Sequence, residues 1–166
     1  MIIKQIDPAE LSPGEMIHFI REAVDKEHVS IVVIDSLNGY LNAMPGEQFL
    51  IIQLHELLSF LGQRGVATLM ASAHHGLIGN NMSSPVDVSY LADAVILMRY
   101  FEARGEVRQA ISVVKKRGGE HERSIREFKM AGGKIQIGKP LKDFHGVLTG
   151  VPVFQGESER LMEPKS

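Results

Sequence analysis

The sequence has no cysteine and no tryptophan, and its apolar runs are short. Without cysteine, disulfide bonds and thiolate metal sites are excluded, which fits a reducing compartment. No apolar stretch approaches the roughly 18 residues needed to span a bilayer, and no basic-then-apolar leader follows Met1. We therefore expect a cytoplasmic protein without a membrane partner.

What is present is an ordinary globular composition over 166 residues, with 44% hydrophobic and 23% charged residues. We predict one domain over residues 1–154 and a polar tail over residues 155–166. The net charge of −2 hides an asymmetry, because residues 99–134 hold ten basic and five acidic side chains. Such a basic region indicates either a surface that meets an anion, such as phosphate or nucleic acid, or the solvated faces of a β-ribbon.

The run Val29–Ile34 is apolar apart from Ser30, rich in β-branched residues, and ends in Asp35 and Ser36. This pattern predicts a strand of a parallel sheet that is covered by helices on both faces. Ligands of such sheets bind beyond the carboxyl ends of the strands, where Asp35 would lie. Asp35 is therefore either the magnesium-positioning acid of a nucleoside triphosphatase or an aspartate that ends the strand and caps the next turn.

The segments around this strand predict two helices. Ser12-Pro13-Gly14-Glu15 forms a capping-box pattern at the start of a helix that runs to about Lys26, after a short strand over Ile2–Ile6. A second helix, from Glu47 to about Gln63, has a wide apolar face that needs deep burial or a partner. Between the helices, Ser36–Gly46 is rich in turn formers and is predicted to be irregular.

A further buried strand, Val66–Ala71, leads into the pair His74-His75. A neutral imidazole at a strand's carboxyl end can sense a phosphate or bind a metal. Adjacent histidines in an extended segment point in opposite directions, so they are not expected to hold one ion together.

The last part of the chain predicts antiparallel β-ribbons. A strand is expected over Ala94–Phe101, and three later segments alternate in polarity with glycine pairs between them. These segments are Val107–Val114, Ser124–Met130 and Lys134–Ile137, and the glycine pairs are Gly118-Gly119 and Gly132-Gly133.

A phosphate-binding loop of the form G-x-x-x-x-G-K-[ST] is not found in the 166 residues. The nearest match, Gly133–Pro140, has proline in place of the metal-binding hydroxyl. Its interior alternates like a strand, and no amphipathic helix follows it. We exclude it as a phosphate cradle.

The segment Val114–Arg123 gathers cations at the end of an expected strand. Lys115 and Arg117 would share one face of that strand, beside a glycine turn. Such a pair could stabilise charge on a transferring phosphoryl group in a neighbour's site, or bind nucleic-acid phosphates without sequence preference. Spacing alone does not choose between them.

Three motifs in this order resemble the KaiC family, RecA-superfamily ATPases named for a circadian-clock protein. They are Val33–Leu37, then Leu91–Asp93 leading into Arg99–Glu106, then Lys115–His121 followed by Ile125–Phe128. The resemblance covers the chain to about Pro152. It implies a RecA-like P-loop NTPase core, ATP with magnesium, and hexameric rings with nucleotide between the subunits. The expected fold class is α/β, with a mainly parallel sheet, helices on both faces and antiparallel ribbons at the carboxyl end.

The resemblance also implies roles for individual residues. Asp35 matches the acid of the Walker B motif, and Ser89 lies where the clock protein carries a phosphorylated serine-threonine pair. Tyr90 replaces the threonine of that pair, which puts autokinase activity in doubt. The positions that would contact nucleotide from the adjacent protomer are Lys115, Lys116, Arg117, Gly119, His121 and Arg123.

In the family, the phosphate-loop strand and helix and the catalytic glutamates precede the region where this chain begins. We interpret the chain as the C-terminal part of one ATP-binding signalling domain, truncated at its N-terminus and inactive alone, with a sheet edge that favours dimerisation. The alternative is a non-catalytic module that oligomerises or binds protein or nucleic acid. Nucleic acid is the weaker choice, because the net charge is acidic and no aromatic platform accompanies the ribbon.

Overall fold

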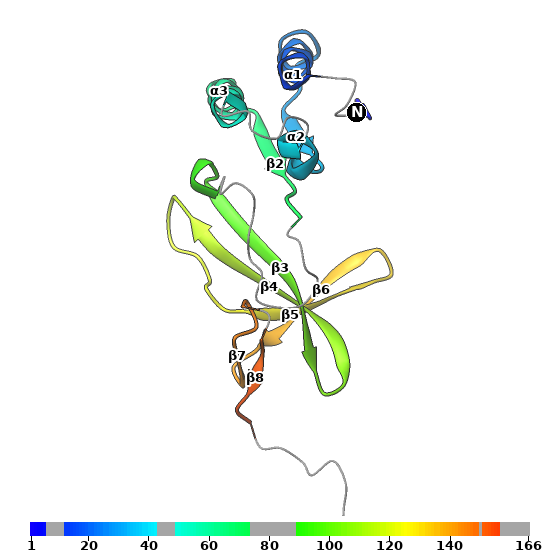
Figure 1. The fold of residues 1–166 in the computed structure, drawn as a ribbon, viewed down its shortest axis with the longest axis vertical. Coiled ribbons are helices and arrows are strands. Elements are labelled where there is room, and N and C mark those ends of the chain that lie inside the picture. Colours follow the sequence, from blue (N-terminus) through cyan, green and yellow to red (C-terminus); the bar gives the residue numbers. More distant parts are fainter. Residues whose placement is uncertain (6–11, 43–48, 74–88, 150, 157–166) are drawn as a thin grey trace, which may run out of the picture. The chain divides into compact units, whose positions relative to one another are not determined.

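The computed structural model describes residues 1–5, 12–42, 49–73, 89–149 and 151–156 (Figure 1). The chain divides into two compact units. Unit 1 comprises residues 1–74 and 85–91, and unit 2 comprises residues 75–84 and 92–166. The single domain expected over residues 1–154 stays a prediction, and most of the expected tail lies outside the described residues. Among the described helices, none has the length and apolar character needed to cross a bilayer.

Helix α1 (Pro13–Glu27) begins as the sequence predicts. The Ser12 hydroxyl accepts a hydrogen bond from the Glu15 backbone N–H at 3.3 Å, and the Glu15 carboxylate accepts one from the Ser12 N–H at 2.9 Å. Hydrogen bonds from Ser12 hold the pKa of Glu15 below its ordinary value. His28, in the left-handed conformation, ends the helix.

The strand expected over Ile2–Ile6 is wrong for the part that can be checked, since residues 1–5 form no strand and Ile6 lies outside the described residues. Isolated extended residues become a strand only when a neighbour supplies ladder hydrogen bonds. Among the described residues of unit 1 the sheet consists of β1 and β2, so residues 1–5 pair with no described strand there.

Unit 1 is built on two parallel strands, β1 (Ile31–Ile34) and β2 (Ala67–Met70), paired in register from Ile31 with Ala67 to Ile34 with Met70. Helices α2 (Leu37–Asn42) and α3 (Phe49–Gln63) connect them. Helix α3 buries a stripe at helical spacing, formed by Leu50, Leu54, Leu57 and Leu61. That stripe packs with α1 and with partly buried strand residues such as Val32.

The prediction that helices cover both faces of these strands is wrong for this structure. Burial alternates along both strands, and Ile31, Val33 and Leu69 are each more than half exposed. In a strand, alternate side chains point to opposite faces, so cover on one face leaves every second residue open. No described element of unit 1 covers the second face.

The segment after β1 is helical from Leu37 to Asn42, although turn formers predicted it to be irregular. Leu37 and Tyr40 lie one turn apart, and both are buried with Leu50 and Leu54. This spacing of apolar residues outweighs the local turn chemistry. Burial raises the pKa of Tyr40 to about 12, and its hydroxyl donates to the Leu50 carbonyl at 3.2 Å.

Unit 2 is an antiparallel sheet of four strands in sequence order (Figure 1). The strands are β3 (Ala94–Ala103), β4 (Glu106–Lys116), β5 (Arg126–Ala131) and β6 (Lys134–Pro140). Two-residue turns join β3 to β4 at Arg104-Gly105 and β5 to β6 at Gly132-Gly133, and all four turn residues have positive φ. This is the backbone that tight hairpin turns require. The predicted ribbons are confirmed.

The α/β class therefore holds, but the expectation of a mainly parallel sheet is wrong for the described residues. Parallel neighbours need a long crossover, and the described strands have one such connection, between β1 and β2. The strands from β3 to β6 follow one another through two-residue turns and one longer loop, between β4 and β5, and such connections can join antiparallel neighbours. The hairpin of β7 (Phe144–His145) and β8 (Val153–Phe154) adds a third small sheet.

The core of unit 2 lies on one face of the four-stranded sheet. It contains Phe101, Ala103 and Ala110 from β3 and β4, with Val147 from the segment that follows β7. Phe144 packs edge-on against Phe101, with ring centroids 5.8 Å apart. The chain after β6 thus covers this face of the sheet.

Candidate functional site

Asp35 follows the last residue of β1 at the carboxyl end of the parallel pair. Its side chain is exposed, and it has no hydrogen-bond or ion-pair partner among the described residues. The peptide bond between Asp35 and Ser36 is cis. Asp35 and Ser36 are among the residues that line an open cavity of about 1040 Å³, which also borders α1 and residues 1–5. The carboxylate is thus available to a ligand at the edge where parallel sheets bind ligands.

Asn38 was not singled out from the sequence, yet its side chain joins the ends of the two parallel strands. Its amide nitrogen donates to the Ala73 carbonyl at 2.7 Å, and its amide oxygen accepts from the Ala73 N–H at 2.7 Å. The Leu37 N–H also donates to the Ala71 carbonyl, at 2.8 Å. These bonds fix the segment after β2 beside the loop that carries Asp35. An asparagine just past a strand was the available sequence signal.

We predict that Asn38→Ala removes both hydrogen bonds and frees the end of β2. The free energy of unfolding should fall by about 1–2 kcal/mol, since two neutral hydrogen bonds are lost. Hydrogen exchange should show lost protection at the Ala73 amide. Asn38→Asp is the matched control, because it keeps the acceptor for that amide and removes only the donor. Unchanged exchange at Ala73 in Asn38→Ala would contradict this role.

The donor set near Asp35 suits magnesium better than a transition metal. A carboxylate oxygen is the ligand that magnesium prefers, usually with several waters and substrate oxygens. Within the described ranges, no group of three histidine or acidic side chains gathers in one place. His74 and His75, which the sequence marked as a phosphate sensor or metal ligand, lie outside the described residues.

The second group of predicted residues begins where β4 ends. A bulge opposite Val95 and Ile96 shifts the register, so that Lys115 lies opposite Val95 and Lys116 opposite Ala94. The Arg117 N–H continues the ladder by donating to the Asp93 carbonyl at 2.7 Å. Lys115 and Arg117 are therefore alternate residues of one extended ladder, as expected for a shared face.

Asp93 forms an ion pair with Arg117 that the count of charged residues in the sequence did not predict. Its carboxylate accepts from the Arg117 guanidinium at 3.0 Å, in an ion pair whose two side chains are mostly exposed. Such a pair contributes little to stability but holds the guanidinium near the start of β3. The motif Leu91-Ala92-Asp93 was visible in the sequence, but its contact with Arg117 depends on pairing across the sheet.

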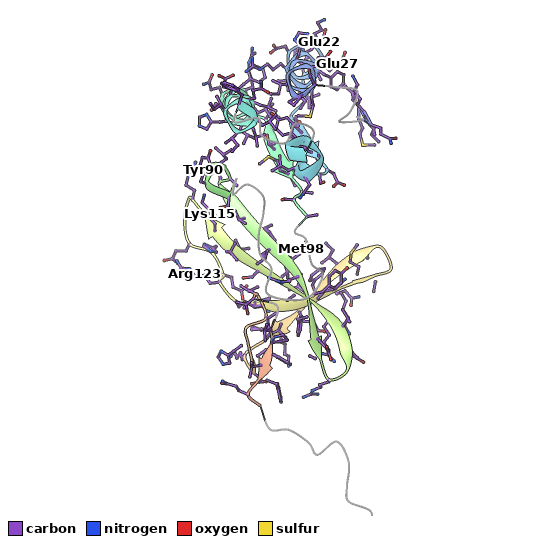
Figure 2. The ribbon with its side chains drawn as sticks, viewed as in Figure 1. Glu22, Glu27, Tyr90, Met98, Lys115 and Arg123 are labelled. Carbon is purple, nitrogen blue, oxygen red and sulfur yellow. The ribbon has the colours of Figure 1, made fainter. Side chains whose placement is uncertain are left out.

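The remaining predicted site residues lie in or beside the glycine turn that follows β4. The Lys116 ammonium donates to the Glu120 carbonyl at 3.2 Å, and Gly119 has a φ of +74° that favours glycine. The Nε2 atom of His121 is buried and has no hydrogen-bond partner in the part of the chain that the structure describes. Arg123 is exposed on the loop between β4 and β5 (Figure 2). A buried ring nitrogen without a partner costs free energy unless a ligand satisfies it.

Part of the basic excess is structural. Arg108 pairs with Glu106 and Glu127, and Arg126 pairs with Glu122. These arginines contact acids of the same sheet or of its β4–β5 loop, as the solvated-ribbon interpretation predicts. Lys116 and Arg123, by contrast, are exposed and make no ion pair with described residues. Arg104, Lys129 and Lys134, on the two hairpins of the same sheet, are exposed as well, so exposure alone does not single out the turn after β4.

Ser89 begins the short 3-10 helix η1 (Ser89–Leu91) and is exposed. Its phosphorylation stays a prediction. Asp35 and Ser89 belong to unit 1, whereas the cationic residues from Lys115 to Arg123 belong to unit 2. The structure therefore describes the predicted site as two groups, each held by its own unit.

The fold belongs to a known class. A KaiC-like protein from the archaeon Pyrococcus horikoshii has a similar structure, with a TM-score of 0.64 and 20% identity. The match covers 75% of this chain and 54% of that one. At this identity the likeness shows the fold, which is RecA-like α/β.

The family follows from the sequence match. The family described as "ATPase: KaiC" matches residues 2–142, so the chain belongs to the KaiC ATPase family. The chain is 37% identical over 103 residues to circadian clock protein KaiC3 of Synechocystis, a match over 62% of this chain and 20% of that protein. It is 26% identical over 145 residues to circadian clock oscillator protein KaiC of Thermostichus vulcanus, covering 87% and 28%. The chain thus spans less than a third of these relatives.

Proposed function

We propose that this chain supplies two parts of a KaiC-like ATPase site: the magnesium-positioning acid Asp35 and the cationic segment that reaches a nucleotide held by the neighbouring protomer. The observation that carries the proposal is the family match over residues 2–142, which includes both groups in one chain. An exposed carboxylate at the carboxyl end of β1 and exposed cations after β4 support these roles.

Asp35 would hold magnesium through its carboxylate, either directly or through metal-bound water. When bound, magnesium would supply positive charge that offsets the negative charge of the phosphates. The role of Asp35 is to keep that cation at the edge of the sheet. Asn38 keeps the neighbouring strand end in place beside it.

The cationic segment would contact the phosphates of ATP. Lys115, Lys116 and Arg117 supply positive charge, and Arg123 adds to it from the loop that follows. Cations placed at a transferring phosphoryl group stabilise its transition state. The Gly119 turn lets the backbone approach closely, and His121 offers a buried nitrogen that a ligand oxygen could satisfy.

The chain alone is proposed not to turn over ATP, because its 166 residues contain no phosphate-loop motif. We predict no magnesium-dependent phosphate release above background from the purified chain, and no difference between it and Asp35→Ala. Hydrolysis by the chain that Asp35→Ala abolishes would contradict this.

The roles proposed for Asp35 and for the cationic segment can be tested only in a complete ATPase domain. We propose a chimera in which the 103-residue stretch of this chain that matches the Synechocystis KaiC3 protein replaces its counterpart there. If the two groups act as proposed, the chimera should assemble and release phosphate from ATP. It then serves as the background for substitutions at Asp35 and in the cationic segment.

A further inference from the structure

The loop between β4 and β5, residues 117–125, forms neither helix nor strand. It nevertheless carries four of the residues predicted to contact nucleotide, namely Arg117, Gly119, His121 and Arg123. Backbone that lacks ladder hydrogen bonds keeps one shape only where side chains hold it. The Lys116 ammonium holds the first part of the loop through the Glu120 carbonyl. The part from His121 to Arg123 needs contacts of its own.

Glu122, between His121 and Arg123, makes such contacts. Its Oε1 atom accepts from the Nε and Nη2 atoms of Arg126, at 2.9 and 2.6 Å, and from the Ser124 hydroxyl. The third guanidinium nitrogen of Arg126, Nη1, donates to the Gly138 carbonyl of β6 at 2.9 Å. Because Arg126 is the first residue of β5, these bonds tie the loop to two strands of the sheet. We call Glu122, Ser124 and Arg126 the loop clamp.

The negative charge of Glu122 is unexpected in a phosphate-binding segment, because an acid there repels the ligand. Arg126 offsets this charge, and its hydrogen bonds, together with that of Ser124, hold the pKa of Glu122 below its ordinary value. Glu122 is therefore ionised at neutral pH and paired. Glu120, the other acid of the loop, has an exposed side chain without a hydrogen-bond or ion-pair partner among the described residues. The two acids thus differ in the clamp, which makes them a matched pair.

We propose that the loop clamp positions Arg123 for the phosphates of the neighbouring protomer's nucleotide, so that Glu122 and Arg126 are positioning residues. This inference rests on the nucleotide contact of the proposed function. A group that is held in place before the ligand arrives need not be ordered on binding, so the ligand binds more tightly. The side chains of Arg126 and Glu122 are 31% and 60% exposed, and such a pair adds little to global stability. Its effect is therefore on the geometry of the loop.

The test is a titration of the full 166-residue chain with inorganic triphosphate at low salt, where charge is least screened. Glu122→Ala and Glu120→Ala remove the same charge from the same loop, but only the first removes the clamp. Both residues are exposed, so the fold should stay intact, which circular dichroism checks. Loss of charge alone should leave the affinity for triphosphate unchanged or raise it about two-fold. Loss of the clamp should lower it about five-fold.

The expected result is weaker binding in Glu122→Ala, unchanged or tighter binding in Glu120→Ala, and no further loss when Glu122→Ala is added to Arg123→Ala. NMR order parameters for the amides of residues 121–124 should fall in Glu122→Ala and stay unchanged in Glu120→Ala.

Two results would overturn the clamp while leaving the proposed nucleotide contact intact. One is triphosphate binding that Glu122→Ala leaves unchanged or tightens, and the other is a loss in Glu122→Ala that adds fully to that of Arg123→Ala. A wild-type chain that does not bind triphosphate would overturn the proposed contact itself, and this inference with it.

Discussion

ATP hydrolysis by the KaiC3-based chimera is expected to fall about 100-fold or more when Asp35 is replaced by asparagine, about 2.7 kcal/mol of transition-state stabilisation. The amide keeps the shape of the side chain but loses the negative charge that attracts magnesium. Asp35 is exposed and without a partner among the described residues, so the folded structure has no contact to lose at this position. Phosphate release at saturating MgATP, with nucleotide binding measured alongside, reports the effect.

The matched control is Asp25→Asn. Asp25 is also an acid of unit 1, but it lies on α1 and pairs with Arg64 at 2.9 Å on the surface. Loss of an exposed pair changes stability by less than about 1 kcal/mol and should leave turnover unchanged. Equal losses in the two variants would remove Asp35 from the site and favour its alternative role as a strand-ending aspartate.

Replacing Leu54 by alanine is expected to lower the free energy of unfolding by about 2–5 kcal/mol. Leu54 is fully buried at the centre of unit 1, where it packs with Met16 of α1 and with Leu37 and Tyr40 of α2. Alanine would remove three buried carbons and leave a cavity that three helices line. Because a domain of this size is only marginally stable, the change should be visible in a urea titration as a lower midpoint.

Ile52→Ala is the control on the same helix. Ile52 lies two residues away and is 55% exposed, so its truncation should change the free energy of unfolding by less than about 0.5 kcal/mol. The pair of variants thus tests whether the leucine stripe of α3, and not helix propensity, stabilises unit 1. Similar losses in both variants would show that the exposed side of α3 is covered in solution.

Structural features that depend on residues close together in the chain could be predicted from the sequence. The capping box at Ser12 and Glu15 and the turn at Gly132-Gly133 each depend on neighbours in the chain, and the structure has both as predicted. The leucine stripe of α3 follows from helical spacing in the same way. The burial of the strands could not be predicted in this way. An apolar run such as Ile31–Ile34 indicates that a strand can be buried on both faces, but it does not indicate which elements are present to cover those faces.

The same distinction applies to the candidate site: its residues could be named from the sequence, but their contacts could not. Asp35 and the cations from Lys115 to Arg123 were named from the order of the motifs along the chain, and they lie within the residues that the family matches. The contacts of Asn38 with Ala73 and of Asp93 with Arg117 join residues 35 and 24 positions apart. Such contacts are set by strand pairing, which a single sequence does not specify residue by residue.

We propose that Asp35 acts within one protomer and that the cationic segment acts on the nucleotide of the neighbouring protomer. Two chimeras test it, one carrying Asp35→Asn and the other Lys115→Ala with Arg117→Ala, each expected to be inactive alone. In a ring assembled from equal amounts, about a quarter of the interfaces would join an intact acid to an intact cationic segment. We predict that phosphate release recovers to about a quarter of the unsubstituted chimera. No recovery in the mixed rings would contradict the account.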